Sequence, residues 1–425
     1  MFFPLGSWRL AALPQKAFCM TTAQPESLPT IHWEEGGDAR SARWRSERGA
    51  AAAARVVLAD DTLPADVAYR LGCEGTALLW RGDFQNARML LQSLTRRLDK
   101  TGERKAKKKP AAAAVAGMPT PQLALPFHQQ RQLQAQRARV LSMVLIELDP
   151  QYAIHLRRAP EVQAACIDAW GAPAGDQPQV VSLRELQALV GAHEWRKKGV
   201  EIPALAKLAP KGYDRIHPHY GVFSPVRGEY VDLIAQAPLP TALAKQSLAY
   251  DIGTGTGVIA AVLARRGIQK VLATDTDPRA LACAKENLER LGVDQRVELA
   301  QTDLFPEGKA ALVVCNPPWV PAKPSAPVER AVYDEGSRML RGFLAGVPAH
   351  LVPGGEAWLI LSDFAEHLGL RSREELLSWI AEAGLQVVGK NHIRPRHPKA
   401  QDGSNPLHQA RAAEMTTLWR LQVAW

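Results

Sequence analysis

Residues 247–260 read SLAYDIGTGTGVIA, and this stretch decides the fold of the C-terminal half. The apolar run at 247–253 predicts a strand and the run at 257–267 a helix, so the glycines lie at a strand-to-helix turn. Glycine lets a backbone turn tightly and approach a ligand closely. A phosphate loop needs Gly-Lys-Ser/Thr, which is absent, and a dinucleotide-binding G-x-G-x-x-G needs a small residue where Val258 stands. The spacing D-x-G-x-G-x-G therefore indicates another kind of small-molecule site.

Strands and helices alternate along the chain on both sides of this turn. Further strands are expected at 270–275, 296–303, 311–318, 356–363, 385–390 and 415–423, and helices at 278–292, 336–351 and 372–384. Such alternation predicts a doubly wound α/β sheet of parallel strands, with ligands at the carboxyl ends of the strands. The two consecutive strands at the end predict an antiparallel closing hairpin.

Acidic residues follow the next two predicted strands. Asp275 ends the strand after the glycine turn, where a carboxylate can accept hydrogen bonds from both hydroxyls of a ribose. Asp277 is better suited to cap the following helix, because a proline occupies the first helical position. Asp303 is placed to accept from an amine of the ligand while Leu304 packs on its ring; a turn-forming aspartate is the alternative.

The most informative stretch is VVCNPPW at 313–319, which follows a buried strand. Two prolines make a rigid turn that donates no backbone hydrogen bonds. The Asn316 side-chain oxygen and the Pro317 carbonyl can then accept both N–H groups of a planar amine or amide and free its delocalised lone pair. Pro318 keeps the turn rigid, and Trp319 offers a flat face for stacking. Catalysis would come from alignment and preorganised acceptors; a surface Pro-Pro loop is the alternative.

With these motifs in register, residues 217–425 resemble a Rossmann-like class I S-adenosylmethionine-dependent methyltransferase with a seven-stranded sheet. The resemblance is to the group with the N-P-P-[YFW] motif: release-factor glutamine, N6-adenine and small-domain rRNA methyltransferases. It implies S-adenosyl-L-methionine as cofactor. The implied cofactor-binding residues are Asp251, Gly253, Thr254, Gly255, Gly257, Asp275, Thr276, Asp303, Leu304 and Asn316, and the implied catalytic residues are Asn316, Pro317, Pro318 and Trp319. The aromatic residue is Trp here, where Tyr or Phe is commoner, which leaves the substrate less defined.

Four further residues are expected to contact the substrate. Phe223 and Arg227 lie in a segment that partly resembles the family's pre-motif region, which packs over the cofactor. Arg394 and Arg396 lie in a basic loop between the last two strands, which either touches phosphates or is simply solvated. No metal site is expected, because the histidines at 217–219 lack a third ligand.

The charge is distributed unevenly along the chain. Residues 221–425 carry equal numbers of basic and acidic side chains, so the net charge of +9 lies entirely in residues 1–220. Much of it is in the short segment 96–109, which is interpreted as a solvated linker; an RNA-binding tail is the alternative. The 5 cysteines are odd in number and widely spaced, which favours a reducing, cytoplasmic setting without disulfides or zinc. No apolar run is long enough to span a membrane.

The N-terminal half is divided by composition into four parts. Residues 1–55 are expected to be a disordered leader, in which Met20 could be the true start, and 56–100 a small α/β segment. Residues 101–126 are expected to be a basic, Ala/Pro-rich linker and 127–218 an accessory recognition region, followed by the catalytic domain at 219–425. Short strands are expected at 55–60, 76–80 and 143–149, and helices at 84–98, 129–141, 160–170 and 183–197.

These features predict an N-methyltransferase acting on a planar nitrogen of a macromolecule. The acceptor is either a protein glutamine of the translation machinery, with ribosome or release-factor association, or the exocyclic amine of a nucleobase; the motif does not separate them. The alternative is an inactive cofactor-binding module that binds RNA or a ribosomal partner. The intact Asn316-Pro317 pair argues against that alternative.

Overall fold

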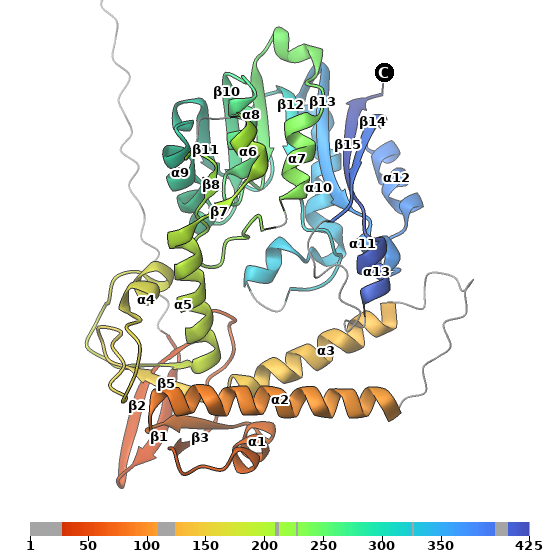
Figure 1. Cartoon of the computed structure of the whole chain (residues 1–425). Helices are drawn as coiled ribbons and strands as arrows, with labels where there is room; N and C mark the ends of the chain where they lie inside the picture. The colour runs from red at the N-terminus through yellow and green to blue at the C-terminus, as the bar shows by residue number, and fades with distance from the viewer. Residues whose placement is uncertain are drawn as a thin grey trace, which may run out of the picture.

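The computed structural model describes most of the chain as two α/β domains (Figure 1). The described residues are 28–108, 124–208, 212–226, 228–324, 327–395 and 407–424. Among these residues no helix has the length and apolar character needed to cross a membrane.

The N-terminal domain is built on a six-stranded sheet with the order β1-β2-β6-β5-β4-β3. Its strands are β1 (Thr30–Glu35), β2 (Asp38–Arg45), β3 (Arg55–Ala59), β4 (Thr76–Trp80), β5 (Val144–Leu148) and β6 (Gln179–Ser182). Its helices are α1 (Ala65–Glu74), α2 (Phe84–Lys108), α3 (Ala124–Leu141), α4 (Gln163–Trp170) and α5 (Leu183–Lys198).

The prediction of a disordered leader over 1–55 is wrong for residues 30–45, which form β1 and β2. Ile31 and Trp33 alternate with exposed residues along β1, and Ala42 and Trp44 do the same at the end of β2. These four side chains are buried in one cluster, so period-two alternation over a short span provides the core contacts. Residues 1–27 lie outside the described part of the chain.

The predicted separation of 56–100 from 127–218 is also wrong, because both segments share one sheet. β4 pairs in parallel with β5 through Leu78 opposite Val144. The predicted linker at 101–126 overlaps two helices: α2 continues to Lys108 and α3 begins at Ala124. Lys, Arg, Glu and Ala are good helix formers, which explains why a basic run extends α2.

The C-terminal domain confirms the predicted seven-stranded doubly wound sheet, with the order β11-β10-β9-β12-β13-β15-β14. Its strands are β9 (Leu248–Ile252), β10 (Lys270–Asp275), β11 (Val297–Gln301), β12 (Ala310–Cys315), β13 (Leu351–Ser362), β14 (Leu385–Ile393) and β15 (Thr416–Val423). β15 runs antiparallel to both β13 and β14, as expected for a closing pair of strands.

Helices cover both faces of this sheet. On one face lie α7 (Glu229–Gln236), α8 (Val258–Arg265) and α9 (Pro278–Leu291), and on the other α10 (Arg338–His350) and α12 (Arg373–Glu382). Two short helices, α11 (Phe364–His367) and α13 (His408–Ala413), pack against each other. The central strand β12 is fully buried: Leu312 and Val314 pack with α8, whereas Val313 and Cys315 pack with α10. Residues that directly follow β12 are therefore delivered to the carboxyl edge of the sheet.

Several contacts join the described parts of the two domains. After α5 the chain forms β7 (Val200–Glu201), α6 (Pro203–Leu208) and β8 (Arg215–Ile216) before it enters the catalytic domain. Separately, α3 extends from the N-terminal domain towards α11 and α13 (Figure 1). Phe127 of α3 is buried in a cluster with Val320, Phe364 and Leu407 of the catalytic domain. The N-terminal domain therefore reaches the carboxyl edge of the catalytic sheet.

Candidate functional site

A cavity of about 520 Å³ lies at the carboxyl edge of the catalytic sheet. It brings together residues predicted from five separate stretches of sequence. Those on its wall are Phe223, Gly253, Thr254, Gly255, Asp275, Thr276, Asp303, Leu304, Asn316, Pro317, Pro318 and Trp319. Asp251 and Gly257 do not line this wall.

The glycine turn requires glycine at each of its three positions. Gly253, Gly255 and Gly257 have φ values of +73°, +56° and +80°, which side chains rarely adopt. A Cβ at Gly253 would lie 2.6 Å from Met339 Cε, whereas a Cβ at Gly255 would meet no atom within 4 Å. The turn thus packs tightly at one end and leaves open space beside Gly255, as a ligand-binding cradle requires.

Asp251 holds this turn from behind. It is fully buried, and its Oδ2 accepts hydrogen bonds from Thr254 Oγ1 (2.7 Å) and from the Ala260 backbone N–H (3.0 Å). Its Oδ1 is buried and has no hydrogen-bond partner among the described residues. Burial raises the pKa of Asp251 to about 7.

Asp275 joins the glycine turn to the end of β10. Its Oδ2 accepts from the Gly255 N–H and its Oδ1 from the Asp277 N–H, each at 3.0 Å. Burial raises the pKa of Asp275. Asp277 caps α9 by accepting from the Arg279 N–H at 2.8 Å, which confirms its predicted structural role.

Asp303 and Leu304 face the cavity from the next strand end. Asp303 Oδ2 lies 2.6 Å from Arg338 Nη2 in an exposed ion pair that the sequence did not reveal. Leu304 has φ +66°, and its carbonyl accepts a hydrogen bond from Thr274 Oγ1 at 2.7 Å. The left-handed backbone fixes Leu304 at the mouth of the cavity.

The residues after β12 have a contact that changes the interpretation of Trp319. The Trp319 indole Nε1–H donates a 2.9 Å hydrogen bond to Asn316 Oδ1, the oxygen predicted to accept a substrate N–H. An amide oxygen has two lone pairs, so one acceptor site remains. Burial raises the pKa of Cys315 well above its usual range, so this thiol is not a nucleophile.

Helix α3 contributes a part of the wall that sequence reasoning missed. Phe127, Gln130, Arg131 and Gln134 line the cavity and lie at helical spacing on one face of α3. The Arg131 guanidinium lies 4.0 Å from the centre of the Tyr333 ring and 3.2 Å from Glu329. The apolar-polar spacing at 127–134 was visible in the sequence, but its partner surface around Val320, Phe364 and Leu407 was not.

Of the remaining predicted substrate residues, one lies away from this wall and two lie outside the described part of the chain. Arg394 is exposed and does not line the cavity, while Arg227 and Arg396 lie outside the described residues. Throughout the described ranges, no group of histidine, cysteine, aspartate and glutamate side chains is arranged to hold a metal.

Comparison with known proteins places the similarity over this half of the chain. The methyltransferase small domain family matches residues 214–376. The release factor glutamine methyltransferase of Xylella fastidiosa is 31% identical over 221 residues, which cover 46% of this chain and 74% of that protein. The enzyme of the same name from Cereibacter sphaeroides is 40% identical over 153 residues, covering 32% of this chain and 52% of that protein.

A third relative is named for a different activity. The ribosomal RNA small subunit methyltransferase C of Alcanivorax borkumensis is 34% identical over 146 residues, covering 33% of this chain and 40% of that protein. The chain thus spans about half the length of some of the relatives that it matches, and the family match at 214–376 lies outside the N-terminal domain.

Proposed function

The chain belongs to the methyltransferase small domain family of class I S-adenosylmethionine-dependent methyltransferases, and we propose that it methylates a glutamine side-chain amide in a protein. The observation that carries this proposal is the position of Asn316 and Pro317 on the same cavity wall as the glycine turn. Glutamine methyltransferases among the relatives and the balanced charge of residues 221–425 favour a protein over a nucleic acid.

The residues at the glycine turn fit S-adenosylmethionine. Gly255 leaves open space for the ligand, and Asp275 and Thr276 face the same cavity from the end of β10. When bound, this cofactor would supply an electrophilic methyl group: the bond from sulfur to methyl breaks to leave a neutral thioether, the bond from nitrogen to methyl forms, and the proton released from nitrogen passes to solvent water. Leu304 and Asp303 would flank the adenine side, and Asp251 would position the turn.

The chain's own part in the transfer is to hold the acceptor nitrogen. One lone pair of Asn316 Oδ1 and the Pro317 carbonyl would accept the two N–H groups of the amide. Both acceptors are preorganised, because Trp319 holds the Asn316 amide and Pro318 keeps the turn rigid. Holding both N–H groups reduces the delocalisation of the nitrogen lone pair into the carbonyl group. The lone pair is then available for attack, and no basic side chain is required.

Helix α3 would hold the polypeptide around the target glutamine. Its cavity-lining residues share the cavity wall with the Asn316–Trp319 turn, and Trp319 packs against the apolar cluster that contains Phe127. This gives the N-terminal domain the recognition role expected for residues 127–218. A release factor or another protein of the translation machinery is the proposed partner.

A nucleobase remains the second candidate acceptor. The whole net charge of +9 lies in residues 1–220, and a basic domain favours a polyanionic partner. An exocyclic amine on a planar ring would meet the same two acceptors, and Trp319 would face the base.

The test is methyl transfer from tritiated S-adenosylmethionine into an extract of cells that lack the gene. Label that protease removes supports the glutamine proposal, and label that nuclease removes supports a nucleobase. An Asn316→Ala variant should bind the cofactor with nearly unchanged affinity but lose transfer by on the order of a hundredfold. Wild-type protein that binds the cofactor and labels nothing would favour the inactive binding module.

A further inference from the structure

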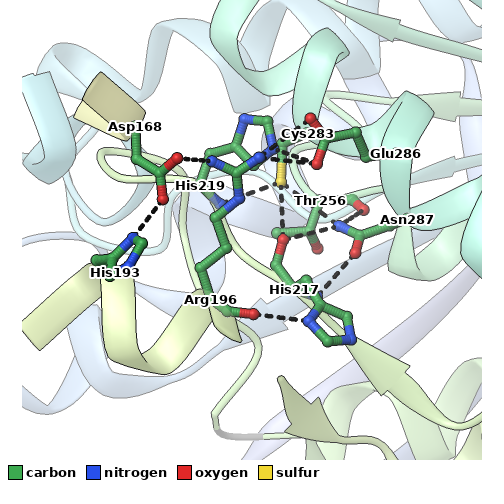
Figure 2. A network of polar contacts seen from close by, with 9 residues as sticks. All are labelled: Asp168, His193, Arg196, His217, His219, Thr256, Cys283, Glu286 and Asn287. Carbon is green, nitrogen blue, oxygen red and sulfur yellow. Dashed lines mark hydrogen bonds and ion pairs between the residues drawn. The ribbon is translucent and has the colours of Figure 1, made fainter. Parts of the chain in front are cut away.

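A buried asparagine links the cofactor turn to the segment that enters the catalytic domain (Figure 2). Asn287 of α9 is fully buried, and its Nδ2–H donates to the Thr256 carbonyl at 3.1 Å. Its Oδ1 accepts from the His217 backbone N–H at 2.7 Å. Thr256 stands between Gly255 and Gly257 and lines the cavity. One amide group therefore ties the cofactor turn to residues 215–219, which we name the entry strap.

The entry strap is held from its other side by α5 of the N-terminal domain. The carbonyl oxygen of Arg196 accepts a hydrogen bond from the His217 ring Nδ1 at 2.6 Å. The Arg196 guanidinium lies 2.9 Å from Asp168 of the N-terminal domain and 2.9 Å from Glu286 of α9. Arg196 thus contacts the entry strap with its backbone and bridges the two domains with its side chain.

The carboxylate partners of Arg196 are themselves fixed by histidines. His193 Nδ1 lies 2.5 Å from Asp168 Oδ2, and His219 Nε2 lies 3.0 Å from Glu286 Oε2. Burial alone would raise the pKa of Glu286, but the hydrogen bonds from His219 and Arg196 lower it overall. Glu286 is therefore an ionised partner for Arg196 at neutral pH.

Backbone geometry leaves the entry strap little freedom. Gly199 ends α5 with φ +70°, and a Cβ there would lie 2.8 Å from the His217 ring. On the other side, the His219 N–H lies 3.3 Å from Cys283 Sγ. Cys283, Glu286 and Asn287 are spaced to form one face of α9. A shift of α5 would therefore move the entry strap, and with it the hydrogen bonds of Asn287.

From these contacts we propose that Arg196 and Asn287 are positioning residues that couple the N-terminal domain to the cofactor turn. The affinity for S-adenosylmethionine then depends on an interdomain contact that does not touch the cofactor. This inference rests on the cofactor site of the proposed function. If the network holds the turn in its binding-competent form, breaking it lowers the apparent affinity in proportion to the lost population.

The first test compares cofactor binding by calorimetry in the full-length chain. Arg196→Ala should weaken binding by about tenfold, and Asn287→Asp, which removes the donor to Thr256, by a similar factor. Lys197→Ala is the matched control, because its ion pair with the exposed Glu194 stays within α5, and its affinity should equal the wild-type value. The KM for the cofactor should rise in Arg196→Ala, while kcat at saturation stays near wild type.

The second measurement is hydrogen exchange without cofactor. The backbone amides of residues 253–257 should exchange faster in Arg196→Ala than in Lys197→Ala. The two variants should have the same denaturant midpoint of unfolding, so the difference in exchange reports local opening of the turn. Equal cofactor affinity and equal exchange in both variants would overturn the coupling. Wild-type protein that binds no S-adenosylmethionine would instead overturn the cofactor assignment, and this inference with it.

Discussion

Trp319 combines a flat face for stacking with a hydrogen-bond donor, and these two roles can be tested separately. It donates to Asn316 Oδ1, so the same side chain provides a flat face and fixes the orientation of the neighbouring amide. Trp319→Phe keeps an aromatic face but removes the donor. We expect kcat to fall by about tenfold, while the KM for the acceptor and the affinity for the cofactor change little.

The control for this prediction is Trp319→Ala, which removes both the donor and the face. Its KM for the acceptor should rise in addition to the loss in kcat, as steady-state kinetics with both substrates would show. A Trp319→Phe enzyme with wild-type kcat would mean that the Asn316 amide needs no help to keep its orientation.

Asp251 gives a prediction on stability. Its pKa is raised by burial to about 7 in the folded state, from 3.8 in an exposed carboxyl. The folded protein therefore binds more protons than the unfolded chain between these values, and this group stabilises the fold at low pH and loses that contribution as pH rises to 7. Asn in its place would keep an acceptor for Thr254 and Ala260 without a buried charge.

We therefore expect the free energy of unfolding of Asp251→Asn at pH 8 to exceed that of wild type by on the order of 2 kcal/mol. The difference between the two proteins should shrink towards pH 4. Urea titrations at several pH values measure it. A wild-type advantage at pH 8 would show that the Asp251 carboxylate is charged and compensated in the fold.

The positions of the residues at strand ends were predictable because parallel strands bring their carboxyl ends to one edge. That rule alone predicts that Gly255, Asp275 and Asn316 lie together, and all three line the cavity. It said nothing of side-chain partners, so the hydrogen bond from Trp319 and the ion pair from Arg338 to Asp303 were not foreseen. Such contacts depend on rotamers and loop paths that a linear pattern does not encode.

At the scale of elements, the catalytic strands were predictable because continuous apolar runs alternate with amphipathic helices. The N-terminal sheet was harder, because β1 and β2 present only two buried side chains each and stand among glycines and charged residues. Its order joins β4 to β5 across the whole length of α2 and α3. Pairing between such distant segments is set by tertiary contacts and not by local propensity.

Helix α3 is the element whose role is most open to test. Gln130 lines the cavity, whereas Leu133 is 57% exposed on the same helix. Gln130→Leu keeps the size of the side chain and removes its hydrogen-bonding groups. If α3 holds the acceptor, the KM for the acceptor should rise by about tenfold with the affinity for the cofactor unchanged.

Leu133→Ser provides the matched control on α3 and should leave both constants at wild-type values. The measurement is the dependence of initial rate on acceptor concentration at saturating cofactor. An unchanged KM in Gln130→Leu would remove this side chain from acceptor recognition and leave the docking of Phe127 as the function of the helix.

At the scale of the whole molecule, the division of charge separates the two binding events. The catalytic half is neutral and the first 220 residues carry the net charge of +9. Binding of the cofactor should therefore depend little on salt, while docking of a macromolecule on the N-terminal domain should weaken as salt rises. The slope of that dependence reports which macromolecule is bound.

A protein acceptor that meets a few of these charges should show a KM that rises about threefold to tenfold between 50 and 200 mM salt. A nucleic acid held through six to ten phosphates would lose about a thousandfold or more over the same range, because bound counterions are released. The measurement is the KM for the labelled acceptor across a salt series, with cofactor affinity followed in parallel. A steep slope would move the acceptor from a protein glutamine to a nucleobase, and a cofactor affinity that fell equally would show that the arginines on the cavity wall contribute to cofactor binding.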